Sequence, residues 1–345
     1  MTNPARLLVV LLSAALVGGC GPTSVTFTFG LDNAKLAEST VLGKDGNGDK
    51  VALIDVRGLI IDEDRPGWFE RGSNPVDDLV SRLDKAAADG QVKAVLLRIN
   101  SPGGAVTASD TMYREIVRFR ETSKKPVVVS MSDVAASGGY YVALSGDEIM
   151  AQPTTITGSI GVIIPTMNFA EGLHRIGIIS RSVKSGQNKD LANPLEPMRD
   201  SQYAILQELV NRMYSRFRNL VIERRTKHGL DVEQADTLMD GRVMTGDEAL
   251  RVGLVDSVGD LHDAFDAAKK RAGIPKARLV KYHSEGESPR TAYASGGTAR
   301  PTAGMGVNPA GPGGTEINLL QLNLSTGTAS AGSGLAYYLW MPNTP

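Results

Sequence analysis

The sequence has very little cysteine and histidine, and this scarcity excludes several kinds of site. One cysteine among 345 residues allows neither an intrachain disulfide nor a multi-cysteine metal site. The four histidines are scattered, and no two have the spacing of a zinc-binding pair. Lys and Arg number 37 against 38 for Asp and Glu, a balance that gives no indication of a nucleic-acid partner. If the chain is an enzyme, we expect it to use neither zinc nor a cysteine nucleophile.

The N-terminal residues have the pattern of an export signal. Arg6 precedes the apolar run Leu7–Val17, which as a helix would be about 17 Å long. That length is too short for the ~30 Å hydrocarbon core of a membrane but is typical of a signal peptide. The run closes on Val-Gly-Gly-Cys, which resembles the lipobox of bacterial lipoproteins. We therefore expect lipidation of Cys20 after cleavage; the alternative is an uncleaved anchor with an incidental cysteine.

The remaining chain divides by composition into a folded part and flanking segments. Hydrophobic residues make up 41% of the chain, which is enough for a sizeable core. Residues 276–345 are rich in Gly, Pro, Ser and Thr, which is typical of a flexible linker. Within them, the apolar islands Ile317–Leu324 and Leu335–Trp340 are each expected to form a short strand or a docking peptide, or to remain disordered. The predicted segments are a signal peptide (1–20), a tether (21–50), a folded domain (51–275) and a largely flexible tail (276–345).

Apolar strands alternate with amphipathic helices through the folded domain. This order predicts right-handed crossovers and a largely parallel sheet, whose strands carry their chemistry at their carboxyl ends. In the stretch 201–228, the apolar positions have the spacing of a helix that faces a core. The expected strands are 51–56, 92–99, 127–131 and 149–151, and the expected helices are 75–87, 108–122, 137–145 and 201–228.

Two glycine-containing loops follow predicted strands. Asn-Ser-Pro-Gly-Gly comes after the 92–99 strand and ends at Gly103 and Gly104, whose amides can face a developing oxyanion. Ala-Ala-Ser-Gly-Gly comes after the 127–131 strand and places Ser137 where a strand turns into a helix. The amide of Gly138 would be a second oxyanion donor. The residue types alone leave alternatives open, because the first loop can be an ordinary turn and Ser137 can be a helix N-cap.

Together the two loops resemble the Clp protease/crotonase-like superfamily. The longer stretch 135–162 resembles the signal peptide peptidase A (SppA) family of Ser/Lys serine peptidases within it, and residues 240–270 resemble the C-terminal region of that family. The resemblance covers about 51–275, which becomes the predicted peptidase domain. It implies an α/β fold with repeated β-β-α units and a largely parallel sheet.

The resemblance also implies a role for each site residue. Ser137 matches the family's nucleophile and Lys189 its general base. Ser159 matches the serine that positions the lysine. Gly104 and Gly138 match the oxyanion donors. No metal or organic cofactor is expected in this site.

The assignment of the base leaves one alternative and one condition. Lys184 competes with Lys189 because it lies in the same short segment. A free lysine has a pKa of about 10.4, so burial against apolar walls must lower that pKa before the amine can act as a base. A carboxylate nearby would oppose this change. We therefore expect the side chain of Asp190 to point away from Lys189.

From these observations we expect a membrane-tethered serine endopeptidase that hydrolyses apolar peptides, especially cleaved signal peptides. The family resemblance implies a ring- or dome-shaped homo-oligomer, in which neighbouring subunits supply the serine and the lysine. The expected location is the bacterial cell envelope, with a lipid anchor in a membrane and the catalytic domain outside the cytoplasm. The alternatives are a non-catalytic lipoprotein scaffold of the same fold and a crotonase-like enzyme acting on acyl-CoA. Export argues against the second alternative, because CoA chemistry is cytoplasmic.

Overall fold

The computed structural model describes residues 36–43, 48–64, 74–284, 288–294 and 337–339. The chain divides into two units after Lys35, and every described residue belongs to the second unit. The predicted signal peptide and Cys20 therefore lie outside the described residues. Among the helices that are described, none is long and apolar enough to cross a membrane.

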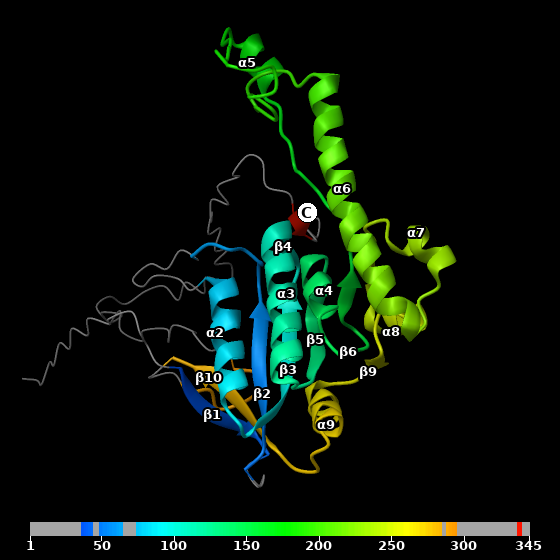
Figure 1. Cartoon of the computed structure of the whole chain (residues 1–345). Helices are drawn as coiled ribbons and strands as arrows, with labels where there is room; N and C mark the ends of the chain where they lie inside the picture. The colour runs from blue at the N-terminus through cyan, green and yellow to red at the C-terminus, as the bar shows by residue number, and fades with distance from the viewer. Residues whose placement is uncertain (1–35, 44–47, 65–73, 285–287, 295–336, 340–345) are drawn as a thin grey trace, which may run out of the picture. The chain divides into compact units, whose positions relative to one another are not determined.

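A mixed, mostly parallel sheet forms the centre of the fold (Figure 1). The strands run in the order β1 (Ala37–Leu42), β10 (Arg278–His283), β2 (Lys50–Arg57), β3 (Val92–Ser101), β5 (Val127–Ala136), β6 (Glu148–Ala151) and β9 (Ser257–Val258), with β7 (Ile156–Gly158) paired to β5 and to β8 (Val243–Thr245). Within the described part of this sheet only β1–β10 and β7–β8 are antiparallel, and the other pairs are parallel. This arrangement confirms the predicted fold class.

Helices cover both faces of the sheet, and the alternation of residues along each strand explains this arrangement. In β2, Ala52 and Ile54 pack into a core shared with α2 (Pro75–Ala88), α3 (Val106–Ser123) and α4 (Gly138–Ala143). Val51 and Leu53 point to the other face and pack into a second core with α9 (Leu261–Arg271). Because both faces of the sheet are buried, its strands read as continuous apolar runs in the sequence.

The sheet extends past the predicted domain boundaries on both sides. Ala37–Leu42, within the predicted tether, forms β1 and pairs with β10. Arg278–His283, within the predicted tail, forms β10 and pairs in parallel with β2. Both strands are short and carry charged residues, so composition alone assigned them to linkers.

The long helix α6 (Asp200–Arg225) confirms the helix predicted over 201–228, but in its first half only Gln202 and Leu206 are buried. Ile205 is 40% exposed and Leu209 is 39% exposed. Phe217 and Val221, in the second half, are completely buried. In Figure 1 the N-terminal half of α6 and the segment with α5 (Ala170–Arg175) project away from the sheet. We call residues 163–199 together with the first half of α6 the arm.

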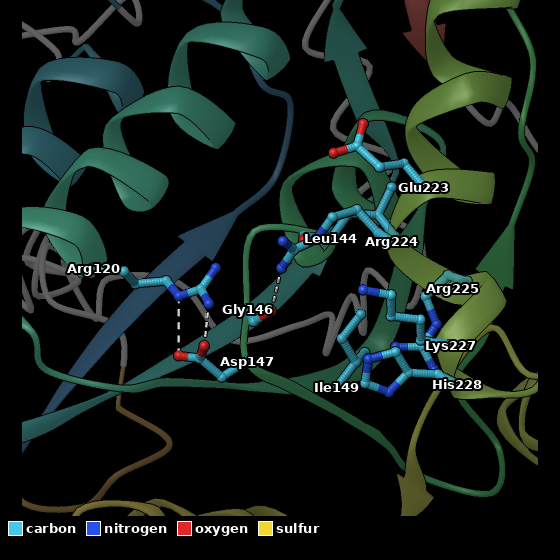
Figure 2. A pocket seen from close by; sticks show the side chains of 10 residues that line it. All are labelled: Arg120, Leu144, Gly146, Asp147, Ile149, Glu223, Arg224, Arg225, Lys227 and His228. Carbon is cyan, nitrogen blue, oxygen red and sulfur yellow. Dashed lines mark hydrogen bonds and ion pairs between the residues drawn. The ribbon is translucent and has the colours of Figure 1, made fainter.

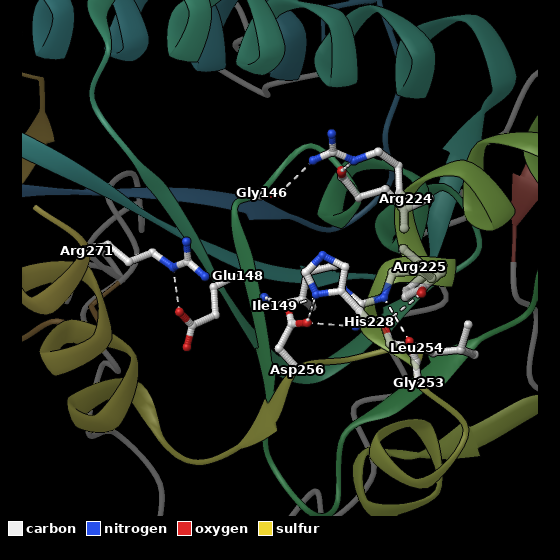
Figure 3. Close-up of polar contacts among 12 residues, drawn as sticks. Gly146, Glu148, Ile149, Arg224, Arg225, His228, Gly253, Leu254, Asp256 and Arg271 are labelled. Carbon is white, nitrogen blue, oxygen red and sulfur yellow. Dashed lines mark hydrogen bonds and ion pairs between the residues drawn. The ribbon is translucent and has the colours of Figure 1, made fainter. Parts of the chain in front are cut away.

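Ion pairs and hydrogen bonds clamp the C-terminal end of α6 to the rest of the fold (Figure 3). The Arg225 guanidinium donates to Asp256 Oδ1 at 2.9 Å and to the Gly253 carbonyl at 2.9 Å. Arg224 donates to the carbonyls of Leu144 at 2.9 Å and Gly146 at 3.0 Å. Burial raises the pKa of Asp256, but hydrogen bonding and charge from Arg225 outweigh this effect, so that the pKa lies below its ordinary value. The C-terminal half of the helix is therefore held to the sheet and its connections.

The connections beyond the clamp are short. A 3-10 turn at Thr226–His228 ends α6, and a second one at Val232–Gln234 leads into α7 (Ala235–Leu238). The strand β8 then leads directly into α8 (Gly246–Arg251). A two-stranded sheet lies apart from the main one, and it pairs β4 (Gly103–Ala105) with β11 (Tyr337–Leu339).

Candidate active site

The ends of two paired strands bring Ser137 and Ser159 to neighbouring positions. In the parallel pair β5–β7, Ala136 lies opposite Gly158, so the two serines follow directly at the carboxyl ends of adjacent strands. The Ser137 amide donates to the Gly158 carbonyl at 2.8 Å, and the Ser159 amide donates to the Arg242 carbonyl at 2.7 Å. Both predicted site serines therefore lie side by side at the edge where a parallel sheet places its chemistry.

Ser137 has a strained backbone at the point where β5 turns into α4. Its φ of 53° lies in the left-handed region, and its ψ is −115°. Residues other than glycine rarely adopt such a conformation, which costs about 1–3 kcal/mol and is concentrated at functional sites. Ser137 stands at the N-cap position of α4, but its side chain makes no capping hydrogen bond. The N-cap alternative is thus not observed, and the strained strand-to-helix turn is a setting that α/β-hydrolases use for a nucleophilic serine.

The two predicted oxyanion glycines face one another next to Ser137. The segment around Ile60 holds β4, because the Ile60 amide donates to the Gly103 carbonyl at 2.9 Å and the Ala105 amide donates back to Ile60 at 2.8 Å. A Cβ atom added to Gly138 would lie 3.1 Å from the Gly104 nitrogen. At Gly104, an added Cβ would collide with the backbone of Ile60, with the carbonyl carbon and the nitrogen both at 2.7 Å. Only glycine therefore allows this approach of the two loops.

Lys189 is exposed and lies in the arm, between α5 and α6. In Figure 1 this part of the chain is far from α4, the helix that begins just after Ser137. No hydrogen bond or ion pair between described residues joins the Lys189 side chain to Ser137 or Ser159. A single chain in this conformation thus brings together the two serines and the two glycines but not the lysine.

Asp190 forms an ion pair with Lys184, the alternative base. Gln202 at the start of α6 also donates to Asp190, at 3.0 Å. Hydrogen bonding from Lys184 holds the pKa of the Asp190 carboxyl below its ordinary value. The Asp190 carboxylate thus contacts Lys184 and Gln202, which is consistent with the expectation that it points away from Lys189. The same ion pair holds the side chain of Lys184, the alternative base.

A separate pocket lies at the clamped end of α6 (Figure 2). Arg120 pairs there with Asp147 through two parallel contacts, and the Arg120 Nε–Asp147 Oδ2 distance is 2.9 Å. Neither the predicted serines nor the predicted lysine lines this pocket, so we assign it to the packing of α6 against the sheet. Its walls are Arg120, Leu144, Gly146, Asp147, Ile149, Glu223, Arg224, Arg225, Lys227 and His228.

Sequence reasoning missed two elements that complete the site. Ile60 forms a parallel bridge with Gly104, and nothing in the sequence around it marks it as a neighbour of a glycine loop more than forty residues away. On the other edge of β4, Tyr338 of β11 lies opposite Gly104. The signal for β11 was the apolar island Leu335–Trp340, but its pairing partner was not predictable from that island.

Comparisons with known proteins identify the family of the chain. The profile of Peptidase family S49 matches residues 120–275, and the profile of Clp protease matches residues 72–157. A SppA-type protein of Enterococcus faecium is 33% identical over 251 residues, which cover 73% of this chain and 72% of that protein. Serine protease SPPA from the chloroplast of Arabidopsis thaliana is 35% identical, with 69% of this chain and 35% of that protein covered. Among solved structures, a ClpP1 variant from Listeria monocytogenes is 20% identical with a TM-score of 0.40, over 61% of this chain and 93% of that one.

The fold and the family matches define a serine peptidase with a Clp-like fold. The chain belongs to peptidase family S49, in agreement with the family resemblance seen in the sequence. This membership favours peptide hydrolysis over the acyl-CoA chemistry that the same superfamily also supports.

Proposed function

We propose that this serine peptidase is a Ser/Lys endopeptidase in which Ser137 is the nucleophile and Lys189 is the general base. The observation that carries the proposal is the strained turn at Ser137, with Ser159 on the adjacent strand and Gly104 against Gly138. In this geometry the Ser137 side chain makes no capping hydrogen bond, Gly138 follows it directly, and a Cβ atom on Gly138 would lie 3.1 Å from the Gly104 nitrogen. A hydroxyl needs a base to become a nucleophile, and no histidine belongs to this cluster.

The reaction we propose is acyl transfer to Ser137 followed by hydrolysis. Ser137 Oγ attacks the peptide carbonyl and forms the C–O bond while Lys189 Nζ takes its proton. The amides of Gly104 and Gly138 stabilise the oxyanion of the tetrahedral intermediate. The protonated Lys189 then gives its proton to the leaving amine as the C–N bond breaks. A water molecule hydrolyses the acyl-enzyme in the same way and regenerates Ser137.

We propose further that Lys189 serves the Ser137 of a neighbouring copy of the chain. The arm that carries Lys189 exposes a large apolar surface, which a monomer would leave in water. Ile176 is 71% exposed, Ile179 is 64% exposed and Val183 is fully exposed. Covering these side chains with a second copy would bury apolar area and surround the lysine with apolar walls, the environment that lowers the pKa of an amine.

Mixing two inactive variants tests both the dyad and its division between copies. Ser137→Ala and Lys189→Ala should each abolish hydrolysis of an apolar peptide. If neighbouring copies share a site in a head-to-tail ring, random 1:1 oligomers of the two variants should recover about a quarter of the wild-type activity. A Lys189→Arg variant, which keeps the charge but does not act as a base near neutral pH, should replace Lys189→Ala with the same result. Full activity in either single variant would refute the dyad, and no recovery in the mixture would refute its division between copies.

We also propose lipid attachment at Cys20, which would hold the peptidase in the bacterial cell envelope, and cleaved signal peptides as substrates. The apolar run before Cys20 and the family relatives support these assignments. Metabolic labelling with an alkyne fatty acid should mark the protein in cells, and the label should disappear in a Cys20→Ala variant. Incubation with a synthetic signal peptide and with a polar peptide of equal length should show faster cleavage of the apolar one.

A further inference from the structure

Ser101 is a buried residue of the Asn-Ser-Pro-Gly-Gly loop that the proposed reaction does not use. It is the last residue of β3 and is completely buried. The Ser101 hydroxyl donates to the Gly58 carbonyl at 2.7 Å and accepts a hydrogen bond from the Gly103 amide at 3.1 Å. A buried hydroxyl is costly unless it is hydrogen-bonded, and both of its partners here are backbone groups. The hydroxyl therefore ties the chain just after β2 to the loop that carries Gly104.

Hydrogen bonds on both sides of Gly103 determine where the Gly104 amide points. Gly103 has a φ of 101°, a conformation that glycine adopts without strain. Its amide donates to Ser101, and its carbonyl accepts a hydrogen bond from the Ile60 amide at 2.9 Å. In a trans peptide the next N–H points in the direction opposite to the carbonyl. The Gly104 amide therefore points away from Ile60 as long as Gly103 keeps this orientation.

The same serine also contacts the loop that carries Ser137. In the parallel pair β3–β5, Ser101 lies opposite Ala135, which comes shortly before the nucleophile. A Cβ atom added to Gly139 would lie 2.7 Å from the Ser101 carbonyl oxygen and 3.4 Å from the Ser101 Cβ atom. Ser101 thus packs against the first turn of α4, the helix that follows Ser137 directly. One buried residue therefore contacts both loops that supply the proposed oxyanion amides.

Asn100, the residue before Ser101, holds the backbone of β5 in a similar way. The register of β3 against β5 shifts between Ile99 and Ser101, so the pairing is irregular shortly before the nucleophile. The Asn100 side chain accepts a hydrogen bond from the Val134 amide at 3.2 Å and donates to Asp133 at 3.1 Å. Strand irregularities of this kind redirect side chains next to active sites. In the Asn-Ser pair, Asn100 thus acts on β5 and Ser101 acts on the glycine loop.

We propose that Ser101 is a positioning residue of the oxyanion site. Its hydroxyl holds the Gly103 amide and thereby sets the direction of the Gly104 amide. The inference rests on the proposed function, because it assumes that the amides of Gly104 and Gly138 stabilise the oxyanion. Loss of the hydroxyl would leave the buried Gly103 amide without its acceptor, so the loop would shift toward another partner. A misplacement of about 1 Å in such a site costs about 100-fold in rate.

Two variants that each remove one buried hydroxyl test this role. Ser101→Ala removes the proposed positioning contact. Ser145→Ala is the matched control, because Ser145 is also completely buried and its hydroxyl donates to the Val142 carbonyl at 2.6 Å. Ser145 lies beyond the C-terminal end of α4, whereas Ser137 lies at the N-terminal end. In Ser101→Ala we expect kcat for a fluorogenic apolar peptide to fall about 10- to 100-fold with KM within about threefold of wild type, and the control should keep both values.

An aldehyde and the corresponding alcohol separate an oxyanion defect from a general loss of structure. With acetyl-Leu-Leu-norleucinal, Ser137 Oγ adds to the aldehyde carbon, its proton passes through Lys189 to the former carbonyl oxygen, and that oxygen then lies in the oxyanion site. The alcohol has the same side chains but cannot react. By calorimetry, wild type should bind the aldehyde at least about 100-fold more tightly than the alcohol. This preference should fall about 10- to 100-fold in Ser101→Ala and stay within about threefold in Ser145→Ala, with the affinity for the alcohol unchanged.

Amide hydrogen exchange reports on the loop without any reaction. In wild type the Gly103 amide is hydrogen-bonded to Ser101, so its exchange should be slow. By mass spectrometry, the segment 101–105 should exchange at least about tenfold faster in Ser101→Ala but not in Ser145→Ala. Circular dichroism checks that each protein is folded. If Ser101→Ala does not fold, Ser101→Cys takes its place, because a thiol forms weaker hydrogen bonds at the same position, and changes of at least about threefold are expected.

The outcomes separate this inference from the peptidase mechanism. If wild type prefers the aldehyde and Ser101→Ala keeps the preference of the control, the positioning role is wrong and Ser137 stays the nucleophile. An equal loss of aldehyde and alcohol affinity would also overturn the role, because it would place Ser101 in substrate binding. If wild type does not prefer the aldehyde, the proposed chemistry is refuted. In that case, faster exchange of 101–105 only in Ser101→Ala supports the positioning of the loop, and equal exchange in both variants overturns it.

Discussion

Moving a single backbone amide tests the oxyanion site directly, although no side-chain deletion can remove that amide. The change is Gly104→Ala. An added methyl group would stand 2.7 Å from both the nitrogen and the carbonyl carbon of Ile60. Real Cβ contacts at that distance essentially do not occur, and the obstacle is backbone rather than a rotatable side chain. The loop with Gly104 must therefore move away from Ile60, and its amide moves with it.

The size of the effect follows from this displacement. Relief of the clash requires a movement of roughly 1 Å, and a misplacement of that size costs about 100-fold in rate. Loss of one oxyanion donor costs about 3 kcal/mol, or 100- to 1,000-fold in kcat. We expect kcat to fall by at least about 100-fold. The free energy of unfolding should also fall, by about 1–3 kcal/mol, because the methyl group overpacks a tight contact.

The assay measures kcat and KM for a fluorogenic apolar peptide, normalised to the folded fraction from urea unfolding. Gly161→Ala is the matched control, because it lies two residues beyond Ser159 but its added Cβ would come only to 3.5 Å of Gly241. The control should keep its kcat within about threefold of wild type, as an ordinary van der Waals contact costs little. A folded Gly104→Ala protein with the kcat of the control would refute the role of this amide.

Three further predictions concern residues outside the proposed dyad that stabilise the fold or the proposed interface between copies. Asp256→Asn should lower the free energy of unfolding by about 3 kcal/mol at pH 7, because it leaves the buried Arg225 without its carboxylate partner. The pKa of Asp256 in the folded protein lies below its unfolded value of about 3.9. In urea unfolding, wild type should therefore lose its stability advantage over the variant only as the pH falls below about 4. Ile179→Asp in the arm should shift the protein toward monomer in light scattering without changing its circular dichroism, and an unchanged mass would contradict the proposed interface. Tyr140→Phe should cost about 1–3 kcal/mol in urea unfolding, because the buried Leu254 carbonyl loses its donor at 2.7 Å.

Much of the site was predictable because its parts follow the ends of adjacent parallel strands. Apolar runs located β3 and β5, and the carboxyl ends of parallel neighbours meet at one edge of a sheet. The loops with Gly104 and Ser137 were therefore expected to meet, and the structure brings them together. The positive φ of Ser137 was not predictable, since serine gives no sign of it and the strain is imposed by the surrounding strands.

Other features depend on contacts that periodicity does not report. The apolar stripe with Ile205 and Leu209 predicts a helix face that packs against other residues, but it does not identify those residues. In the single chain both side chains are exposed. The strands β1 and β10 were not predicted, because charged residues lie between their apolar ones. They pair with each other across more than 200 residues of sequence, which no local pattern reports. The position of Lys189 relative to Ser137 stays a prediction, because no contact between described residues joins the two side chains and the neighbouring copy that would bring them together is itself a proposal.

The register of the β5–β7 pair has a consequence for how this sequence can change in length. Ala136 opposite Gly158 fixes the two serines at the same level. Insertion of one residue within either strand would turn the following side chain to the opposite face and separate Ser137 from Ser159. Insertions in the arm leave this register untouched. Lengthening during evolution, or by an engineered tag, should therefore be rejected in the segments 134–137 and 156–159, whereas an insertion between α5 and α6 would keep this register but move Lys189 along the arm.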